Sequence, residues 1–281
     1  MQIAKVFGLM TALTLFLVLV GQSVGGSQGA VFFFVLAMAM NFGTYWFSDK
    51  AVLRMYKAQV IGPSDAPGLF QMVDRLRQNA GLPMPTVAIA PQQQPNAFAT
   101  GRNKDHAVVC VTLGLMNMLN EKELEGVIAH ELAHIKHRHM LVGTLAAGLA
   151  GTVAMLASIA KWGVILGTGR DDDRGNPFVL LIMAIVAPIV AVIIQTAISR
   201  QNEFQADATA AHIVGDRRGL QSALRRIQAG AERIPMDVNP AAAHMAIINP
   251  FAGGAFNALQ RLTSTHPPTE DRIAALDQVQ L

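Results

Sequence analysis

The sequence has one cysteine and little charge for its length of 281 residues. The single cysteine, Cys110, excludes an intramolecular disulfide and fits a reducing compartment; because it lies in a strand-like run, we expect it in the core. Charged residues make up only 15% of the chain, whereas soluble domains have about 25%, and this deficit indicates contact with lipid. The net charge of +3 is mild, and in a membrane protein such an excess belongs to cytoplasmic loops, so it gives no argument for nucleic acid.

In place of charge, the chain has long apolar runs. Four of them resemble membrane-spanning helices: Val6–Val20, Ala30–Phe47, Met140–Leu166 and Phe178–Ile198. The last run would extend about 31 Å as a helix, which matches a hydrocarbon core of about 30 Å. The first run has a cleavable signal peptide as its alternative reading. A second run follows it closely, however, so the pair looks like a hairpin.

Charge placement predicts how these runs are oriented. Residues 21–29, between the first two runs, carry no charge, whereas six basic residues flank the opposite ends of the runs: Lys50, Arg54, Lys57, Lys136, Arg138 and Arg200. The positive-inside rule therefore places 48–139 and 199–281 in the cytoplasm. We expect membrane hairpins at 1–47 and 140–198, and a cytoplasmic domain built from the two remaining parts.

The cytoplasmic parts predict a small α+β domain. Three β-branched runs are separated by turn-favouring residues and predict a small, mostly antiparallel sheet: Thr86–Ala90, Asn96–Gly101 and Ala107–Thr112. A helix is expected at 64–81, with Ser64 or Asp65 near its N-cap and Gly81 as its stop. Another is expected at 120–139, where Asn120 and Glu123 resemble a capping box. No glycine or proline separates it from Met140, so nothing stops it from continuing into the third run. The predicted fold class is a mainly α membrane protein with four transmembrane helices and this cytoplasmic domain.

The stretch His130-Glu131-Leu132-Ala133-His134 has the spacing of a metal site. Histidines four residues apart lie one helical turn apart on the same face, where both imidazoles can bind one tetrahedral zinc ion. Glu131 then lies beside the metal, placed to take a proton from zinc-bound water. With this chain's His and Glu frequencies, H-E-x-x-H would arise by chance in roughly one such sequence in 200. The alternative is a helix whose two histidines simply face solvent.

A catalytic zinc needs a third protein ligand and an open position. The best candidates follow the fourth apolar run, where Glu203 and Asp207 are four residues apart and share a helical face. One carboxylate can bind the metal while the other holds a ligand histidine through its remaining ring N–H. Two predicted membrane crossings separate His134 from Glu203 and return them to the same side. A helix with ordinary surface salt bridges is the alternative.

These features together resemble a known family. H-E-x-x-H, a transmembrane hairpin and the pattern R-x-x-E-F-x-A-D from Arg200 are similar to the membrane-bound gluzincin proteases of the HtpX type. These are heat-shock-associated enzymes of the bacterial cytoplasmic membrane and relatives of the CAAX prenyl endopeptidases. The likeness covers essentially the whole chain, including 95–101 and 265–273. It implies a zincin-like domain with one zinc ion per chain, bound by His130, His134 and Glu203, and with Glu131 as the general base.

The resemblance also implies roles for five further residues. Asp207 and Arg200 would support the zinc ligands. Asn96 and Ala97 would lie on the edge strand that pairs with the substrate backbone. His266 would donate a hydrogen bond to the tetrahedral oxyanion.

The chain departs from the family pattern at two positions. Asn202 stands where relatives often have a second arginine, and His139 stands where they tend to have an acidic residue. Neither position is a ligand, but both affect the charge balance around the site and hence substrate preference and pH optimum. His137 and His139 also lie beside Lys136 and Arg138 in a basic cluster that is expected to meet anionic lipid headgroups.

The expected function is a zinc endopeptidase of the bacterial cytoplasmic membrane, multi-pass, with its active site facing the cytoplasm. Its partners would be misfolded or damaged membrane proteins and the lipid bilayer, with no nucleic acid or nucleotide. One alternative is an intramembrane protease, but charged residues flank the motif: Glu121, Glu123, Glu125, Lys136 and Arg138. Another is a non-catalytic scaffold with a structural zinc, although such sites usually use four Cys or His ligands.

Overall fold

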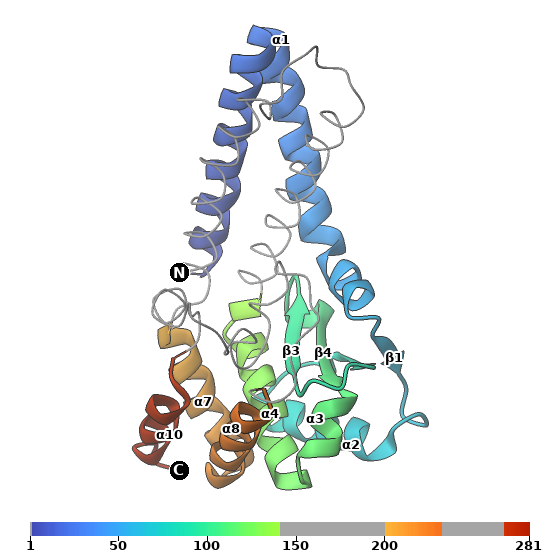
Figure 1. Cartoon of the computed structure of the whole chain (residues 1–281), viewed down its shortest axis with the longest axis vertical. Helices are drawn as coiled ribbons and strands as arrows, with labels where there is room; N and C mark the ends of the chain where they lie inside the picture. Colours follow the sequence, from blue (N-terminus) through green and yellow to red (C-terminus); the bar gives the residue numbers. More distant parts are fainter. Residues whose placement is uncertain (1, 141–199, 232–266) are drawn as a thin grey trace, which may run out of the picture.

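The computed structural model describes residues 2–140, 200–231 and 267–281 (Figure 1). Helix α1 (Gln2–Met55) consists of two arms that meet at Gly25 and Gly26, where the backbone leaves the helical conformation. Gly26 has a φ of 58°, which a residue without a side chain adopts easily. Figure 1 shows both arms extending away from the rest of the molecule. They are joined by Asn41, whose Nδ2 donates to Thr14 Oγ1 at 3.0 Å. The first two apolar runs therefore lie on two helical arms in contact with each other, and that both arms cross a membrane remains a prediction.

Among the described residues, one helix is long and apolar enough to cross a membrane, Gly25–Phe47. Met10–Leu19 in the first arm is apolar but shorter. The third and fourth predicted spans lie outside the described residues, apart from Met140, so four spans remain a prediction. The second arm continues beyond Phe47, and Val52 is buried where the arm reaches the sheet.

The sheet has four strands in the order β1-β2-β4-β3: β1 (Gln59–Ile61), β2 (Thr86–Ala90), β3 (Ala97–Gly101) and β4 (Ala107–Thr112). Two pairings are antiparallel and one, β2 with β4, is parallel. The three predicted strands and their mostly antiparallel pairing are confirmed. Strand β1 was not predicted, because three residues are too few for an alternating pattern to be recognised.

Strand β4 is buried along its whole length because both faces of the sheet are covered. Val109 and Val111 pack against the helices, whereas Val108 and Cys110 belong to a smaller cluster with the end of α1. Cys110 is therefore a core residue, as predicted. Burial, and then the nearby carboxylate of Glu131, raise the pKa of this thiol to about 12.

The remaining elements are helical, and the central one is α4 (Glu121–Lys136). The others are α2 (Pro67–Ala80), the short 3-10 helix η1 (Lys104–His106), α3 (Leu113–Met118), α7 (Arg200–Val214), α8 (Arg218–Ala231) and α10 (Thr269–Asp277). Helix α4 contacts β3, β4, α2, α7 and α8, and Figure 1 shows it between the sheet and the α7–α8 pair. Asp65 lies next to the N-cap of α2, as predicted, but the N-cap residue itself is Ala66; the Asp65 carboxylate accepts from the Gly62 N–H at 2.7 Å and does not cap the helix.

The N-terminus of α4 is held by the predicted capping box. Asn120 Oδ1 accepts from the Glu123 N–H at 3.0 Å, and Glu123 Oε2 accepts from the Asn120 N–H at 2.9 Å. The Glu123 carboxylate also accepts from Ser222 Oγ at 2.6 Å and Arg226 Nη1 at 2.7 Å, both on α8. One buried carboxylate therefore caps α4 and joins it to α8.

Replacing Glu123 with glutamine is expected to lower the free energy of unfolding by about 1–2 kcal/mol at pH 7. Burial raises the pKa of Glu123, but hydrogen bonds from Ser222, Asn120 and Arg226 outweigh it and leave the pKa lowered. A lowered folded-state pKa gives stability that is present above the usual glutamate value of about 4.3 and is lost as pH falls through the folded value. Denaturant unfolding in detergent at pH 7 and pH 4 checks this. A difference between wild type and variant that did not shrink at pH 4 would contradict it.

Helices α4 and α8 cross at Gly126. A Cβ placed on Gly126 would lie 2.7 Å from the Leu220 backbone nitrogen and 2.8 Å from its Cα. Backbone atoms cannot yield as a flexible side chain can, so any side chain at this position forces the helices apart.

Replacing Gly126 with alanine is therefore expected to destabilise the domain by about 1–3 kcal/mol, despite the better helix propensity of alanine. The matched control is Gly68→Ala in α2, where an added Cβ meets nothing within 4 Å. The control is expected to be neutral or slightly stabilising. Denaturant unfolding of both variants checks the pair, and equal midpoints would show that α4 and α8 are not in close contact there.

The end of α4 differs from the sequence prediction. The helix ends at Lys136, and Arg138 adopts a left-handed backbone conformation with φ of 60°. Helical conformation resumes at His139. The helix therefore does not continue straight into the third apolar run, and the intervening turn redirects the side chain of His139.

The sheet is also attached to helix α1. The guanidinium carbon of Arg102, directly after β3, lies 4.6 Å from the centre of the Trp46 ring. Trp46 is near the end of the candidate span Gly25–Phe47. This cation–π contact holds the end of β3 against the part of α1 that leaves the apolar segment.

Candidate metal centre

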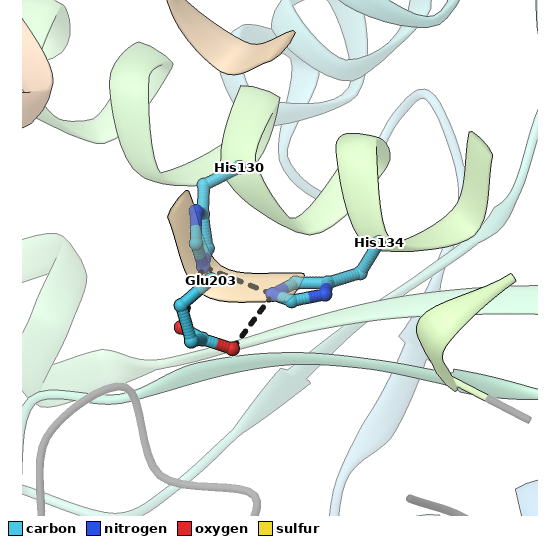
Figure 2. Close-up of side chains that lie close together, drawn as sticks. All are labelled: His130, His134 and Glu203. Atoms are coloured by element: carbon cyan, nitrogen blue, oxygen red, sulfur yellow. Dashed lines mark hydrogen bonds and ion pairs between the residues drawn. The ribbon is translucent and has the colours of Figure 1, made fainter. Parts of the chain in front are cut away.

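Helices α4 and α7 together bring three metal-binding side chains to one point. His130 and His134 lie one turn apart on α4, and Glu203 extends toward them from the first turn of α7 (Figure 2). The two Nε2 atoms are 3.0 Å apart. Glu203 Oε2 is 3.6 Å from His130 Nε2, and Glu203 Oε1 is 3.5 Å from His134 Nε2. Among the described residues, these three form the group that could hold a metal ion.

The spacing of these donor atoms fits a zinc ion. With zinc–ligand bonds of about 2.0–2.1 Å and tetrahedral angles, two ligand atoms are separated by about 3.4 Å. The three observed separations lie between 3.0 and 3.6 Å. Two imidazoles and one carboxylate are also a donor set of catalytic zinc sites, which leave the fourth position open.

The ligands differ in exposure. The side chains of His130 and Glu203 are 4% and 3% exposed, whereas that of His134 is 15% exposed. Solvent or a substrate therefore reaches this site from the His134 side.

His130 is held by a charged network behind it. Its Nδ1 lies 2.9 Å from Asp207 Oδ1, one turn after Glu203 on α7. Asp207 in turn accepts two hydrogen bonds from Arg272 of α10, at 2.8 Å from Nε and 2.7 Å from Nη2. Arg272 is 1% exposed, and its Nη1 lies 3.6 Å from Glu203 Oε2. Helix α10 thus holds Glu203 in place through Arg272, and it also holds Asp207, the residue that orients His130.

Arg272 was not predicted as a site residue. It lies 65 positions after Asp207, on a short helix whose neighbouring residues Ile273 and Leu276 are buried. In the sequence, residues 265–273 contribute to the family likeness, but they give Arg272 no role at the site. An arginine beside buried aliphatic residues, following a Pro-Pro pair, was the one local signal available.

The network sets the protonation of the site. Burial raises the pKa of Asp207, but Arg272 and then His130 outweigh it, so the pKa is lowered and Asp207 is ionised at neutral pH. Burial lowers the pKa of His130, but Asp207 and then Glu203 raise it more, to about 9. A metal ion that binds His130 must therefore displace a proton.

The second ligand, His134, contacts a residue with no predicted role at the metal. His134 Nδ1 lies 3.1 Å from His139 Nδ1, and His139 is 6% exposed. Burial, and then the neighbouring His137, lower the pKa of His139 to about 4. His137 Nε2 is 2.9 Å from Thr209 Oγ1 of α7. His139 is therefore buried against the site and His137 contacts α7, whereas Lys136 and Arg138 are exposed, so contact of this cluster with lipid headgroups remains a prediction.

The other predicted site residues are distributed as follows. Glu131 is 5% exposed, and its negative charge raises the pKa of both Cys110 and Arg272. Arg200 is exposed at the first residue of α7. Because Arg200 is exposed, its role in supporting the zinc ligands remains a prediction.

The predicted substrate strand is at an edge of the sheet. Ala97 begins β3, which among the described strands pairs with β4 alone. Asn96 is fully buried, and its backbone N–H donates to Thr112 Oγ1 at 2.9 Å. His266 lies outside the described residues, so its role also remains a prediction.

Comparison with known proteins gives consistent matches. The sequence profile of Peptidase family M48 matches residues 63–280. A "Protease HtpX homolog" of Desulfatibacillum aliphaticivorans is 56% identical over 271 residues, which cover 95% of this chain and 86% of that protein. A protein with the same name from Gemmatimonas aurantiaca is 55% identical over 272 residues, covering 97% of each. The crystal structure of S. mikatae Ste24p superposes with a TM-score of 0.55 at 18% identity; the match covers 98% of this chain and spans 65% of that one, and shows a shared fold.

Proposed function

The chain belongs to peptidase family M48, and on that premise we propose that it is a zinc-dependent endopeptidase that cleaves misfolded or damaged membrane proteins at the cytoplasmic face of the membrane. Family membership confirms the resemblance to HtpX-type proteases and makes the chain a membrane-associated metalloprotease. The observation that carries the proposal further is the convergence of His130 Nε2, His134 Nε2 and the Glu203 carboxylate, one oxygen of which lies 3.6 Å from the first nitrogen and the other 3.5 Å from the second, as ligands of one zinc ion would.

The proposed roles follow from the geometry of the site. A bound zinc ion supplies a Lewis acid that polarises the scissile carbonyl and makes water more acidic. His130, His134 and Glu203 hold the ion, and Asp207 keeps the proton of His130 on Nδ1 so that Nε2 is free to bind. Glu131, next to the first ligand on α4, takes a proton from the attacking water and returns it to the leaving amine.

The proposed substrate site is the edge of β3. A peptide strand that pairs with β3 gains main-chain hydrogen bonds, which give affinity with little dependence on sequence. Helix α4 packs against β3, so a peptide on this edge lies beside the helix that carries the histidines. This arrangement suits unfolded substrates of many sequences. Ala97 begins the strand and Asn96 directly precedes it. We further propose that His266 donates a hydrogen bond to the oxyanion and that Arg200 supports the ligands.

The proposed placement at the membrane rests on α1. The hairpin holds the domain beside the bilayer, and the contact of Arg102 with Trp46 holds the end of β3 near the membrane boundary. Segments that unfold from a damaged membrane protein emerge at this boundary. We propose a multi-pass protein with four spans, with 48–139 and 199–281 in the cytoplasm, because the basic residues next to the apolar runs lie in these parts.

Removing the metal tests the proposed function. The full chain in detergent is expected to contain about one zinc per chain, and 1,10-phenanthroline is expected to reduce cleavage of a denatured protein by at least about 100-fold. One equivalent of zinc is expected to restore cleavage, whereas magnesium is not, because a two-histidine site favours zinc over a hard cation. The control is 1,7-phenanthroline, an isomer that does not chelate. Full cleavage by zinc-free protein would overturn the proposal.

A further inference from the structure

His134 reaches the metal position through Nε2, so its other ring nitrogen, Nδ1, points to the opposite side. That nitrogen lies 3.1 Å from Nδ1 of His139, and the two rings meet at 67° with centroids 5.3 Å apart. This is hydrogen-bond distance between two ring nitrogens, and it requires that one carries a proton and the other does not.

Metal binding decides which nitrogen carries the proton. An imidazole that binds a metal through Nε2 keeps its proton on Nδ1 and donates it to an acceptor, which fixes the orientation of the ring. His134 is then the donor and His139 the acceptor, with the proton of His139 on its own Nε2. The side chain of Gln205, on α7, also hydrogen-bonds the side chain of His139, and its amide oxygen is the kind of acceptor that this second N–H needs.

The backbone is shaped to make this contact. An uninterrupted helix would direct residue 139 away from His134, since residues five apart do not share a helical face. The left-handed Arg138 interrupts α4 and turns His139 back toward His134. The bond between His137 and Thr209 attaches the same turn to α7, the helix that supplies Glu203. His139 is 6% exposed, so little water is available to replace it as the acceptor.

We propose that His139 is a positioning residue of the metal centre, accepting the hydrogen bond of His134 Nδ1 and thereby aiming His134 Nε2 at the ion. The inference rests on the proposed function, because it takes His134 as a ligand. The two histidines are then oriented by different chemistry: a carboxylate, Asp207, holds His130, and a neutral imidazole holds His134.

The test compares zinc affinity of the full chain in detergent for two variants of similar size. His139→Leu removes the acceptor, whereas His139→Asn places an amide oxygen close to the position of Nδ1. The leucine variant is expected to bind zinc 10- to 100-fold more weakly in competition with a chromophoric chelator, which is the usual loss for partners of metal ligands. The asparagine variant is expected to stay within about threefold of wild type. Cobalt-loaded protein gives a second measurement, since the visible absorption bands of cobalt change when a ligand ring is misaligned.

Two further measurements separate positioning from folding. Thermal unfolding of the metal-free variants is expected to be equal, and with saturating zinc the leucine variant is expected to lower kcat while leaving KM unchanged. His212→Ala, which removes an exposed histidine of α7, is expected to keep wild-type zinc affinity. If the leucine variant does not fold, His139→Gln is compared with His139→Asn instead. The longer glutamine side chain moves the acceptor oxygen away from His134 Nδ1, so this variant is expected to bind zinc more weakly than the asparagine variant.

The outcomes are distinct. Wild-type affinity in the leucine variant, or equal weakening in the leucine and asparagine variants, would overturn the role of His139. Absence of zinc from the wild type, or wild-type affinity in His134→Ala, would instead show that the proposed metal centre is wrong.

Discussion

Replacing Glu131 with glutamine is expected to reduce kcat/KM for a denatured membrane protein by at least about 1,000-fold while leaving zinc content near one per chain. Glutamine has the same shape but cannot accept a proton at neutral pH, so water is no longer activated and the leaving amine is no longer protonated. Glu131 is not one of the three donors that converge on the metal position. The substitution therefore removes chemistry and leaves the ligands in place.

The measurement is a pair of assays on one preparation: zinc by atomic absorption and cleavage of a fluorescently labelled, denatured membrane protein. The matched control is Glu125→Gln, also on α4, whose carboxylate pairs with Arg75 at 3.0 Å on the opposite end of the helix from the site. An exposed pair of this kind contributes little, so the control is expected to keep both zinc and activity. Cleavage within tenfold of wild type in Glu131→Gln would place the base elsewhere, and loss of zinc would show that Glu131 holds the site together instead.

The parts of this structure that could be predicted from the sequence are those with a local signal. Histidines at i and i+4 share a face in any helix, and Glu203 and Asp207 have the same spacing, so each half of the site was visible in a single stretch. The three longer strands were predicted with boundaries correct to one residue, because β-branched runs between turn-favouring residues have few other solutions.

The parts that could not be predicted depend on contacts far apart in the chain or on unusual backbone conformation. Arg272 reaches Asp207 across 65 positions, and nothing near Arg272 identifies its partner. Arg138 is left-handed, a conformation costing an L-residue about 1–2 kcal/mol, so propensity predicts a continuous helix there. In the parallel pairing of β2 with β4, the intervening strand β3 lies beyond β4 at the edge of the sheet. This order depends on the packing of α4 against β3 and β4, and not on the sequences of the strands alone.

The second large effect is expected at the third ligand. Replacing Glu203 with alanine is expected to weaken zinc binding by well over 100-fold, since partners that only orient a ligand already account for 10- to 100-fold. Two losses combine: the ion loses one of three protein donors, and the site loses a negative charge. Arg272 stays behind with Nη1 directed at the position of the missing carboxylate, so a buried positive charge then faces the incoming cation.

Charge and geometry can be separated by a second variant, Glu203→Gln, which keeps an oxygen donor but not the charge. Once the metal has displaced the proton of His130, three ionised carboxylates and the Arg272 guanidinium give the site a formal charge of −2, which a divalent ion neutralises. Both variants make this charge less negative, at −1, so the difference between them reports the donor oxygen. Asp216→Asn is the charge control, because this carboxylate is partnered with Arg218 on the turn before α8 and is expected to leave zinc affinity unchanged. Zinc retained at one per chain with wild-type affinity in Glu203→Ala would exclude Glu203 as a ligand, and the convergence of α4 and α7 would then need another explanation.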